Sequence, residues 1–364
     1  MGLQTALCDL LQIQHPIMVA GMGGVTLHEL TAAVSNCGSI GTIGAIGLSA
    51  EGLLEEIRAV KKLLKPGMPF GVDLLLPAVG GNARKTNEDY TKGHLDVLVD
   101  ILIEEHVPLF VCAVGVPPKW VCEKLHMAGT VVMNMVGAPH HVPKALASGC
   151  DIICAQGTEA GGHTGDVATL VLVPQCVDLV KGHTNYFGKP VQVVAAGGIV
   201  DGRGVAAAIA LGASGVWCGT RFLMTPEANA PQNYKELMIE AKCTDTQRSL
   251  IFSGRPMRVF RNAAVREWEG KRLMEQRELL QQGKVPMLVE ATKKESSATY
   301  LPPTKSVDTR EKSFDVDSMA MPMGQGVGAV NKIMPAEEIV KEMVHDATQA
   351  LALGATLVVA QAKL

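Results

Sequence analysis

One histidine stands in a glycine-rich stretch whose surroundings suit a catalytic base. The stretch is DIICAQGTEAGGHTG (151–165), in which Gly161 and Gly162 directly precede His163. Glycine lets a backbone pass close to a ligand and adopt conformations that other residues avoid. An imidazole that follows a buried apolar run on such a loop is well placed to accept a proton. A histidine that only hydrogen-bonds to the loop backbone would give the same pattern, so both interpretations stay open.

Two further glycine-rich stretches have the chemistry of a phosphate cradle. They are AAGGIVDGRG (195–204), which contains Gly197 and Gly198, and WCGTRF (217–222), which contains Gly219 and Thr220. Glycines leave backbone amides uncovered, and the hydroxyl of a threonine adds one donor. Glycine also serves tight turns, so neither stretch identifies a phosphate site without its position in the fold.

The elements that must position these residues alternate between strand and helix. We expect the amphipathic segments that lie between the strand candidates to be helices. They are 28–36, 51–64, 92–105, 118–127, 140–148, 168–181 and 203–211. Eight buried parallel strands with helices between them predict an α/β fold, a TIM (β/α)8 barrel, over an open doubly wound sheet. The eight apolar strand candidates are 17–22, 39–45, 70–76, 109–114, 130–135, 151–156, 191–198 and 215–222.

The regular alternation stops after residue 222. We expect residues 1–226 and 335–364 to form the barrel, with a closing helix at 335–352 whose buried face carries Ile339, Met343 and Ala347. Residues 227–334 are expected to form a helical insertion or small second domain over the barrel. Within it, 290–330 reads as a long loop.

In this fold, active sites lie at the carboxyl ends of the strands. Those ends carry polar or glycine-rich residues, and the loops after strands seven and eight commonly bind phosphate. The two glycine-rich stretches occupy these last two positions, which raises the weight of a phosphate site. The residues collected at the ends are Gly21, Met22, Gly23, Gly24, Asp73, Asn134, His163, Gly197, Gly198, Gly219 and Thr220.

Other polar residues have simpler interpretations. His140 and His141 stand at a helix start without a third ligand spaced for zinc, so no metal site is predicted. Asp73 and Glu159 could contact a ligand or cap a turn. The basic stretch Arg255–Arg261 could meet an anion, but a solvated face is the favoured interpretation.

The composition argues against several classes of protein. Hydrophobic residues make up 47% of the chain and the net charge is −3, so there is no electrostatic case for binding nucleic acid. The apolar runs are strand-length, so no membrane span is expected. The nine cysteines are scattered without a C-x-x-C pair and read as reduced thiols. The tripeptide Ala362-Lys363-Leu364 resembles the peroxisomal import signal and predicts a peroxisomal location and an import receptor as partner in a eukaryote, or a cytoplasmic location otherwise.

Six ordered motifs then carry a resemblance to a known family. With PIMVAGMGG (16–24) and the glycine-rich stretches above, the chain resembles the nitronate monooxygenases, formerly called 2-nitropropane dioxygenases, and especially their eukaryotic and fungal members. The six motifs are PIMVAGMGG (16–24), FGVDLLLP (70–77), VMNMVGAP (132–139), CAQGTEAGGHTGD (154–166), VVAAGGIVDGRG (193–204) and GTRF (219–222). Three more segments that resemble these members are GNARKTNEDYTKG (81–93), FSGRPMRV (252–259) and MGQGVGAV…MPAEEIVKEMV (323–344).

The resemblance implies a non-covalent FMN with its phosphate at the loops after strands seven and eight. It implies that His163 faces the flavin as catalytic base and that Gln325 closes the site. The complete set of cofactor-binding residues expected by resemblance is Ala20, Gly21, Met22, Asp73, Asn134, Gln156, Gly161, Gly162, Ala196, Gly197, Gly198, Gly219, Thr220 and Gln325.

The implied reaction is the oxidation of alkyl nitronates by dioxygen to carbonyl compounds and nitrite. For a neutral nitroalkane, His163 would first remove the proton next to the nitro group. Two alternatives stay open on the same frame. One is an NAD(P)H-dependent FMN reductase of quinones or enoyl thioesters, and the other is a flavin-binding protein without turnover. The sequence leaves the oligomeric state unknown.

Overall fold

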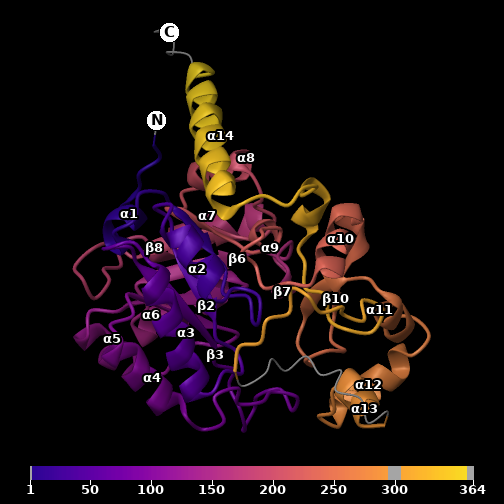
Figure 1. The fold of residues 1–364 in the computed structure, drawn as a ribbon. Coiled ribbons are helices and arrows are strands. Elements are labelled where there is room, and N and C mark those ends of the chain that lie inside the picture. Colours follow the sequence, from indigo (N-terminus) through magenta and orange to yellow (C-terminus); the bar gives the residue numbers. More distant parts are fainter. Residues whose placement is uncertain (1, 294–304, 359–364) are drawn as a thin grey trace, which may run out of the picture.

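A closed barrel of eight parallel strands forms the centre of the protein (Figure 1). The computed structural model describes residues 2–293 and 305–358. The strand order is β1-β9-β8-β6-β5-β4-β3-β2, and a parallel bridge between Met18 and Ile40 joins the two ends of this order. The predicted TIM barrel is therefore confirmed. Its strands are β1 Ile17–Val19, β2 Gly41–Gly44, β3 Phe70–Leu75, β4 Leu109–Ala113, β5 Val131–Val136, β6 Ile152–Gln156, β8 Gln192–Ala196 and β9 Gly215–Cys218.

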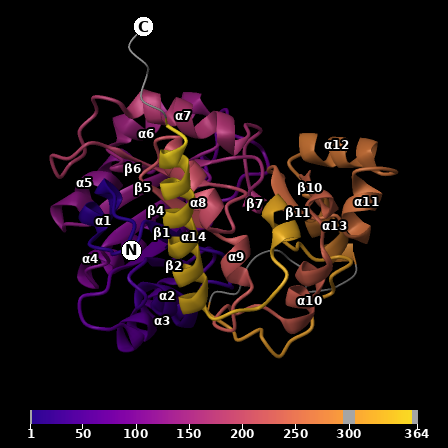
Figure 2. The same cartoon turned by 90° about the horizontal axis from the view of Figure 1, so that it is seen from above.

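The helices expected between the strands are present on the outside of the barrel (Figure 2). The largest boundary shift is in the helix expected at 92–105, which begins at Leu95 because residues 76–94 form a long loop. They are α2 His28–Ser35, α3 Ala50–Leu63, α4 Leu95–Glu104, α5 Lys119–Met127, α6 Val142–Ser148 (preceded by the 3-10 turn η1, Pro139–His141), α7 Thr169–Val180 and α8 Gly202–Ala210.

The strands are continuous apolar runs because both of their faces are buried. In β6, Ile152 and Cys154 belong to the cluster inside the barrel, whereas Ile153 and Ala155 belong to the cluster between the barrel and its helices. Side chains of a strand alternate between its two faces, so a run without polar residues is what a barrel strand requires.

The amino-terminal end of the barrel is covered by α1 (Ala6–Leu11), a helix that the sequence pattern did not predict. Leu7 and Leu11 of α1 are buried in the cluster inside the barrel. At the carboxyl end, the described residues border a cavity instead, and this difference leaves that end available for a site.

The closing helix α14 (Ala336–Thr356) packs against α8 and α2 and extends a few residues beyond the predicted end. Its predicted face is confirmed, because Ile339, Met343 and Ala347 are buried. A Cβ at Gly202 would lie 2.5 Å from backbone atoms of Met343 and Ala347, so glycine permits the close approach of the two helices. In residues 2–293 and 305–358, no helix has the length and apolar character that crossing a membrane requires.

The insertion contains a sheet that the sequence pattern did not reveal. Its helices are joined by β10 (Thr246–Ser249) and β11 (Met257–Phe260), and β11 also pairs with β7 (Gly162–His163), a short strand in the loop after β6. The expected helical insertion thus contains a small sheet as well as its helices. Its helices are α10 Gln232–Glu240, α11 Ala263–Trp268, α12 Leu273–Gln281 and α13 Pro286–Lys293, with 3-10 turns η2 Cys243–Asp245 and η3 Gln325–Ala329. The short helix α9 (Thr220–Leu223) precedes the insertion and follows β9, where the sequence pattern predicted a strand up to residue 222.

The basic stretch in this insertion is not a solvated face. Arg258 lies on β11 and is 8% exposed, with Nε donating to Thr158 O and Nη1 donating to Thr246 Oγ1. Arg255 is partly buried, and of the three arginines only Arg261 is exposed. Strand pairing, which was not visible in the sequence, turns these side chains inward.

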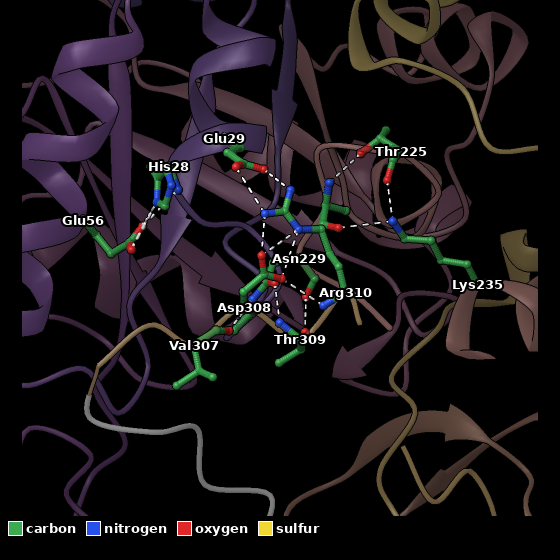
Figure 3. A network of polar contacts seen from close by, with 12 residues as sticks. His28, Glu29, Glu56, Thr225, Asn229, Lys235, Val307, Asp308, Thr309 and Arg310 are labelled. Atoms are coloured by element: carbon green, nitrogen blue, oxygen red, sulfur yellow. Dashed lines mark hydrogen bonds and ion pairs between the residues drawn. The ribbon is translucent and has the colours of Figure 1, made fainter. Parts of the chain in front are cut away.

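The segment before η3 crosses back to the barrel as an extended loop (Figure 3). Asn229 accepts a hydrogen bond from Thr309 N and donates to Val307 O and to Gly24 O. Arg310 pairs with Glu29 of α2. These contacts fix the loop after β1, which is expected to face the cofactor. The part of the predicted loop at 294–304 and the tripeptide Ala362-Lys363-Leu364 lie outside the described residues.

Candidate functional site

A cavity of about 1500 Å³ opens at the carboxyl ends of the barrel strands. Every loop that follows a barrel strand contributes to its wall, and the insertion adds Tyr234, Arg255, Pro256 and the segment around Gly324. Apart from Gln325, every residue expected to bind the cofactor lines this cavity. Those residues are Ala20, Gly21, Met22, Asp73, Asn134, Gln156, Gly161, Gly162, Ala196, Gly197, Gly198, Gly219 and Thr220.

Gln325 belongs to η3, beside the cavity, but it does not line the wall. Its backbone amide donates to Glu159 O at 2.9 Å. Its neighbours Gly324 and Gly326 do line the cavity. The structure therefore brings the backbone of this segment to the site, and a closing role for the Gln325 side chain stays a prediction.

His163 is held at the cavity wall by strand pairing. In β7 it lies opposite Met257 of β11, and its carbonyl accepts a hydrogen bond from the side chain of Gln156. Gly161 allows the tight path of this loop, because a Cβ there would lie 2.8 Å from Gly324 N. The orientation of the imidazole thus depends on the insertion as well as on the barrel.

The imidazole of His163 is kept neutral by its surroundings. Its Nε2 lies 2.9 Å from Ser253 Oγ, which can donate or accept according to the tautomer. Burial, and then the nearby charge of Arg255, lower the pKa of His163 to about 4. A neutral imidazole at physiological pH can accept a proton, although a low pKa makes it a weak base.

The loops after β8 and β9 form a glycine-lined concavity suited to phosphate. Gly197 and Gly198 have φ angles of +100° and +74°, a conformation that favours glycine. In residues 2–293 and 305–358, the amides of Gly197, Gly198 and Gly219 donate no hydrogen bond. The hydroxyl of Thr220 accepts from Gly324 N at 2.9 Å, which brings the insertion to this concavity. Uncovered amides of this kind fit the phosphate of FMN.

Glu159 supports this concavity from behind and does not face a ligand. Its carboxylate accepts from the amide and the hydroxyl of Thr169 at the start of α7, and that hydroxyl also donates to Gly197 O. Of the two predicted roles for Glu159, the structure therefore favours the capping of a turn.

Two buried polar side chains in the middle of the cavity wall keep one oxygen unsatisfied. Asp73 Oδ1 and Asn134 Oδ1 have no hydrogen-bond partner within the described part of the chain. Asn134 is oriented by donating to Cys112 O and Gly115 O at 2.9 and 2.7 Å. Burial raises the pKa of Asp73 well above its usual range. Buried polar atoms without partners point to a polar ligand, and the edge of a flavin ring system fits them.

Two functional residues were missed from the sequence. Ser253 contacts His163, and Arg255 lines the cavity, although it was assigned to a solvated face. The segment FSGRPMRV (252–259), which contributed to the family resemblance, contains both residues and could have indicated them. His140 and His141, which were expected to be structural, lie at the cavity wall on η1. No cluster of three metal-binding side chains occurs in the part of the chain that the structure describes.

Comparisons with known proteins show which family the chain resembles. The profile of the family described as nitronate monooxygenase matches residues 4–346. The chain is 35% identical over 297 residues to a Staphylococcus saprophyticus protein named probable nitronate monooxygenase, covering 72% of this chain and 80% of the relative. It is also 35% identical over 269 residues to a Mycobacterium tuberculosis protein named (3aS,4S,5R,7aS)-5-hydroxy-7a-methyl-1-oxo-octahydro-1H-indene-4-carboxyl-CoA dehydrogenase, covering 74% and 69%.

Solved structures extend the similarity to nearly the whole chain. FabK from Thermotoga maritima superimposes with a TM-score of 0.77 at 29% identity, covering 98% of this chain and all of the other. A nitroalkane oxidase from Streptomyces ansochromogenes superimposes with a TM-score of 0.74 at 27% identity, covering 96% and 99%. Both curated relatives are bacterial, so the expected closeness to eukaryotic members stays a prediction.

Proposed function

Because the chain belongs to the nitronate monooxygenase family, we propose that it oxidises alkyl nitronates with FMN and dioxygen to carbonyl compounds and nitrite. The family and its relatives make it a flavin-dependent oxidoreductase. The identity of the flavin as FMN, the nitronate substrate and the residue roles below are parts of the proposal. Neutral nitroalkanes are expected to be slower substrates.

One observation carries this proposal, namely a single cavity that combines the glycine-lined concavity with the imidazole of His163. The loop after β6 and the insertion bring this neutral imidazole to the cavity wall. The concavity suits the phosphate of a flavin, and a proton acceptor in the same cavity would allow a neutral nitroalkane to react as well.

The residues of the cavity suggest how FMN would be held. Gly197, Gly198 and Gly219 would offer uncovered amides to its phosphate, while the carboxyl of Asp73 and the amide of Asn134 would meet the polar edge of its ring system. When bound, FMN supplies the redox chemistry, taking electrons from the substrate and passing them to dioxygen.

The low pKa of His163 bears on which substrate is preferred. A nitronate has already lost its carbon-bound proton, so it needs no base. A nitroalkane must give that proton to a ring nitrogen of His163, and a weak base accepts it slowly. After the transfer, Ser253 Oγ can accept a hydrogen bond from the protonated ring. The low pKa of His163 therefore favours the nitronate over the nitroalkane as substrate.

A second function is favoured by the size of the cavity. A volume of about 1500 Å³ exceeds the roughly 300–1000 Å³ of ordinary ligand sites. The cavity wall also includes Trp120 at the start of α5 and His141 on η1. A cavity of this size would suit the NAD(P)H-dependent reduction of a quinone or an enoyl thioester. The Mycobacterium tuberculosis relative is named as a dehydrogenase of a carboxyl-CoA compound.

Anaerobic reduction of the purified, FMN-loaded protein separates the two functions. We expect an added alkyl nitronate to bleach the flavin absorbance, and NADH or NADPH to leave it unchanged over the same time. Rapid bleaching by a nicotinamide and none by the nitronate would replace the first function by the second. A protein that takes up no FMN would exclude both.

A peroxisomal location in a eukaryotic source is also part of the proposal, because Ala362-Lys363-Leu364 resembles the import signal. A fluorescent protein that ends in these three residues should collect in yeast peroxisomes. Diffuse fluorescence would contradict this part alone.

A further inference from the structure

We propose that Arg255 selects anionic nitronates over neutral nitroalkanes, because it places a guanidinium that no carboxylate neutralises in the cavity beside His163. The inference rests on the proposed function, since it names the residue that recognises the proposed substrate. A planar nitro or nitronate group presents two oxygens, and a planar guanidinium can donate to both.

Strand pairing places Arg255 beside the base. Arg255 stands two residues before Met257, and Met257 pairs with His163 across β11 and β7. Thr164 N donates to Pro256 O at 3.1 Å, which continues the contact between the two segments. Both Arg255 and His163 line the cavity. The cation and the base therefore lie on one rigid wall.

The guanidinium is fixed by two neutral acceptors from barrel loops. Nη1 donates to Asn87 Oδ1 at 2.8 Å, and Nη2 donates to Val114 O at 2.9 Å. Asn87 is itself held, because its Nδ2 donates to Ala78 O. In the described part of the chain these two bonds use two of the five N–H groups of Arg255, so further donors are available to a ligand.

The backbone that receives Arg255 is strained. Val114 has a φ of +70°, which is a genuine outlier for a β-branched residue. The carbonyl of this residue is the acceptor for Nη2 of Arg255. A strained carbonyl that orients a cavity-lining cation is the kind of strain that functional sites retain.

The charge of Arg255 is not neutralised within residues 2–293 and 305–358. Arg272 and Arg310, in contrast, each pair with more than one carboxylate. Around Arg255 the other titratable groups are Arg84, which repels it, the phenol of Tyr90, and His163. A partly buried cation without a counter-ion attracts an anionic ligand, because the ligand removes the cost of leaving the charge unpaired.

The charge of Arg255 favours the nitronate over the nitroalkane in two ways. It attracts the negative oxygens of a nitronate, and it weakens His163 as the base that a neutral nitroalkane needs. Removing it should therefore weaken nitronate binding and at the same time raise the pKa of His163.

The experiment compares the FMN-loaded wild type with Arg255→Met and Arg255→Lys. Arg261→Met is the matched control, because Arg261 is exposed at the end of the same strand. Nitrate serves as a planar anion of similar shape, and its binding is followed by the change in flavin absorbance. The pKa of His163 is followed by NMR of labelled imidazole, and the KM values of a nitronate and its nitroalkane are measured on each variant.

We expect Arg255→Met to weaken nitrate binding and to raise the nitronate KM by about 10- to 100-fold, the loss typical of a charge-assisted hydrogen bond. The nitroalkane KM should change little, and the pKa of His163 should rise towards 6.5. Arg255→Lys should restore part of the nitrate affinity, and Arg261→Met should match the wild type.

Unchanged nitrate affinity in both Arg255 variants would overturn the proposal, as would an equal loss for nitronate and nitroalkane. If Arg255→Met does not retain FMN, the Arg255→Lys comparison decides. A wild type that binds nitrate through Arg255 but oxidises no nitronate would contradict the proposed function and leave the anion site standing.

Discussion

The two ends of the barrel each hold a histidine, and the partners of the two rings differ. At the amino-terminal end, His126 is almost fully buried, with Nε2 2.8 Å from Asp151 Oδ2 and its ring stacked on Tyr186 at a centroid distance of 4.4 Å. At the carboxyl end, His163 has a hydroxyl partner, Ser253, and a neighbouring cation, Arg255. One ring has a carboxylate beside it, and the other has a positive charge.

The difference extends to the polar atoms around each ring. Asp151 accepts from His126, from Val132 N and from Tyr186 N, so both of its oxygens are used within the protein. Asp73 and Asn134 at the other end each keep a buried oxygen without a partner in the described part of the chain. Polar groups whose hydrogen bonds are made within the protein stabilise a fold, whereas buried polar groups without a partner are available to a ligand. The comparison assigns stability to the amino-terminal end and chemistry to the carboxyl end, as in other barrels of this class.

The largest effect should follow from removing the base at the carboxyl end. His163→Asn should lower kcat/KM for a neutral nitroalkane by at least about 100-fold, because general base catalysis typically contributes 10²–10⁴-fold. The variant should retain FMN and should oxidise a preformed nitronate, which needs no proton transfer. Steady-state oxygen consumption with the two substrates measures the difference.

Ser253→Ala is the control for this prediction, because it removes the hydroxyl partner and leaves the imidazole in place. We expect its loss to be less than about 10-fold, the cost of one neutral hydrogen bond. If His163→Asn still processes the nitroalkane at the wild-type rate, the base lies elsewhere.

A change at the amino-terminal end should reduce stability and leave the chemistry intact. Asp151→Ala leaves the amides of Val132 and Tyr186 and the ring of His126 without their acceptor, at a cost of about 3–5 kcal/mol. Thermal unfolding followed by circular dichroism should show a lower midpoint, while FMN content and kcat of the folded fraction stay at wild-type values. Asp151→Asn, which keeps one oxygen acceptor, should lose less. A variant of normal stability with lost activity would reverse the assignment of the two ends.

The barrel could be predicted from the sequence because its signals are local. Each strand is an unbroken apolar run and each loop begins where the run stops, so the positions of His163 and of the glycines at 197, 198 and 219 followed from the strand count. Gly129 and Gly149, which follow the ends of α5 and α6, have positive φ angles of +83° and +101°, the conformation in which glycine commonly ends a helix. Local sequence thus determined both the frame and most of the cavity wall.

The insertion could not be predicted in the same way, because its contacts are long-range. β7 has two residues, Gly162 and His163, and only its pairing with β11, far away in the sequence, makes it a strand. That pairing also buries Arg258 and brings Arg255 into the cavity. A basic stretch with no visible partner reads as a solvated face, and this is why the arginine beside the base was missed.

The last prediction concerns how acid changes the stability of the folded protein through His163 at the carboxyl end. The pKa of His163 is about 4 in the folded protein and about 6.5 in the unfolded chain, so between these values the unfolded state binds more protons. His163 therefore costs no stability above about pH 6.5, and the folded state loses stability as the pH falls from there to about 4. Removing the titrating ring should remove this loss. As the pH falls from about 6.5 to about 4, the unfolding midpoint of His163→Asn should rise relative to that of the wild type. From pH 7 to 8, the difference between the two midpoints should stay constant. Scanning calorimetry of both proteins at half-unit pH steps measures it, and parallel midpoints from pH 7 to pH 4 would mean that His163 titrates normally and that the contrast between the two histidines does not hold.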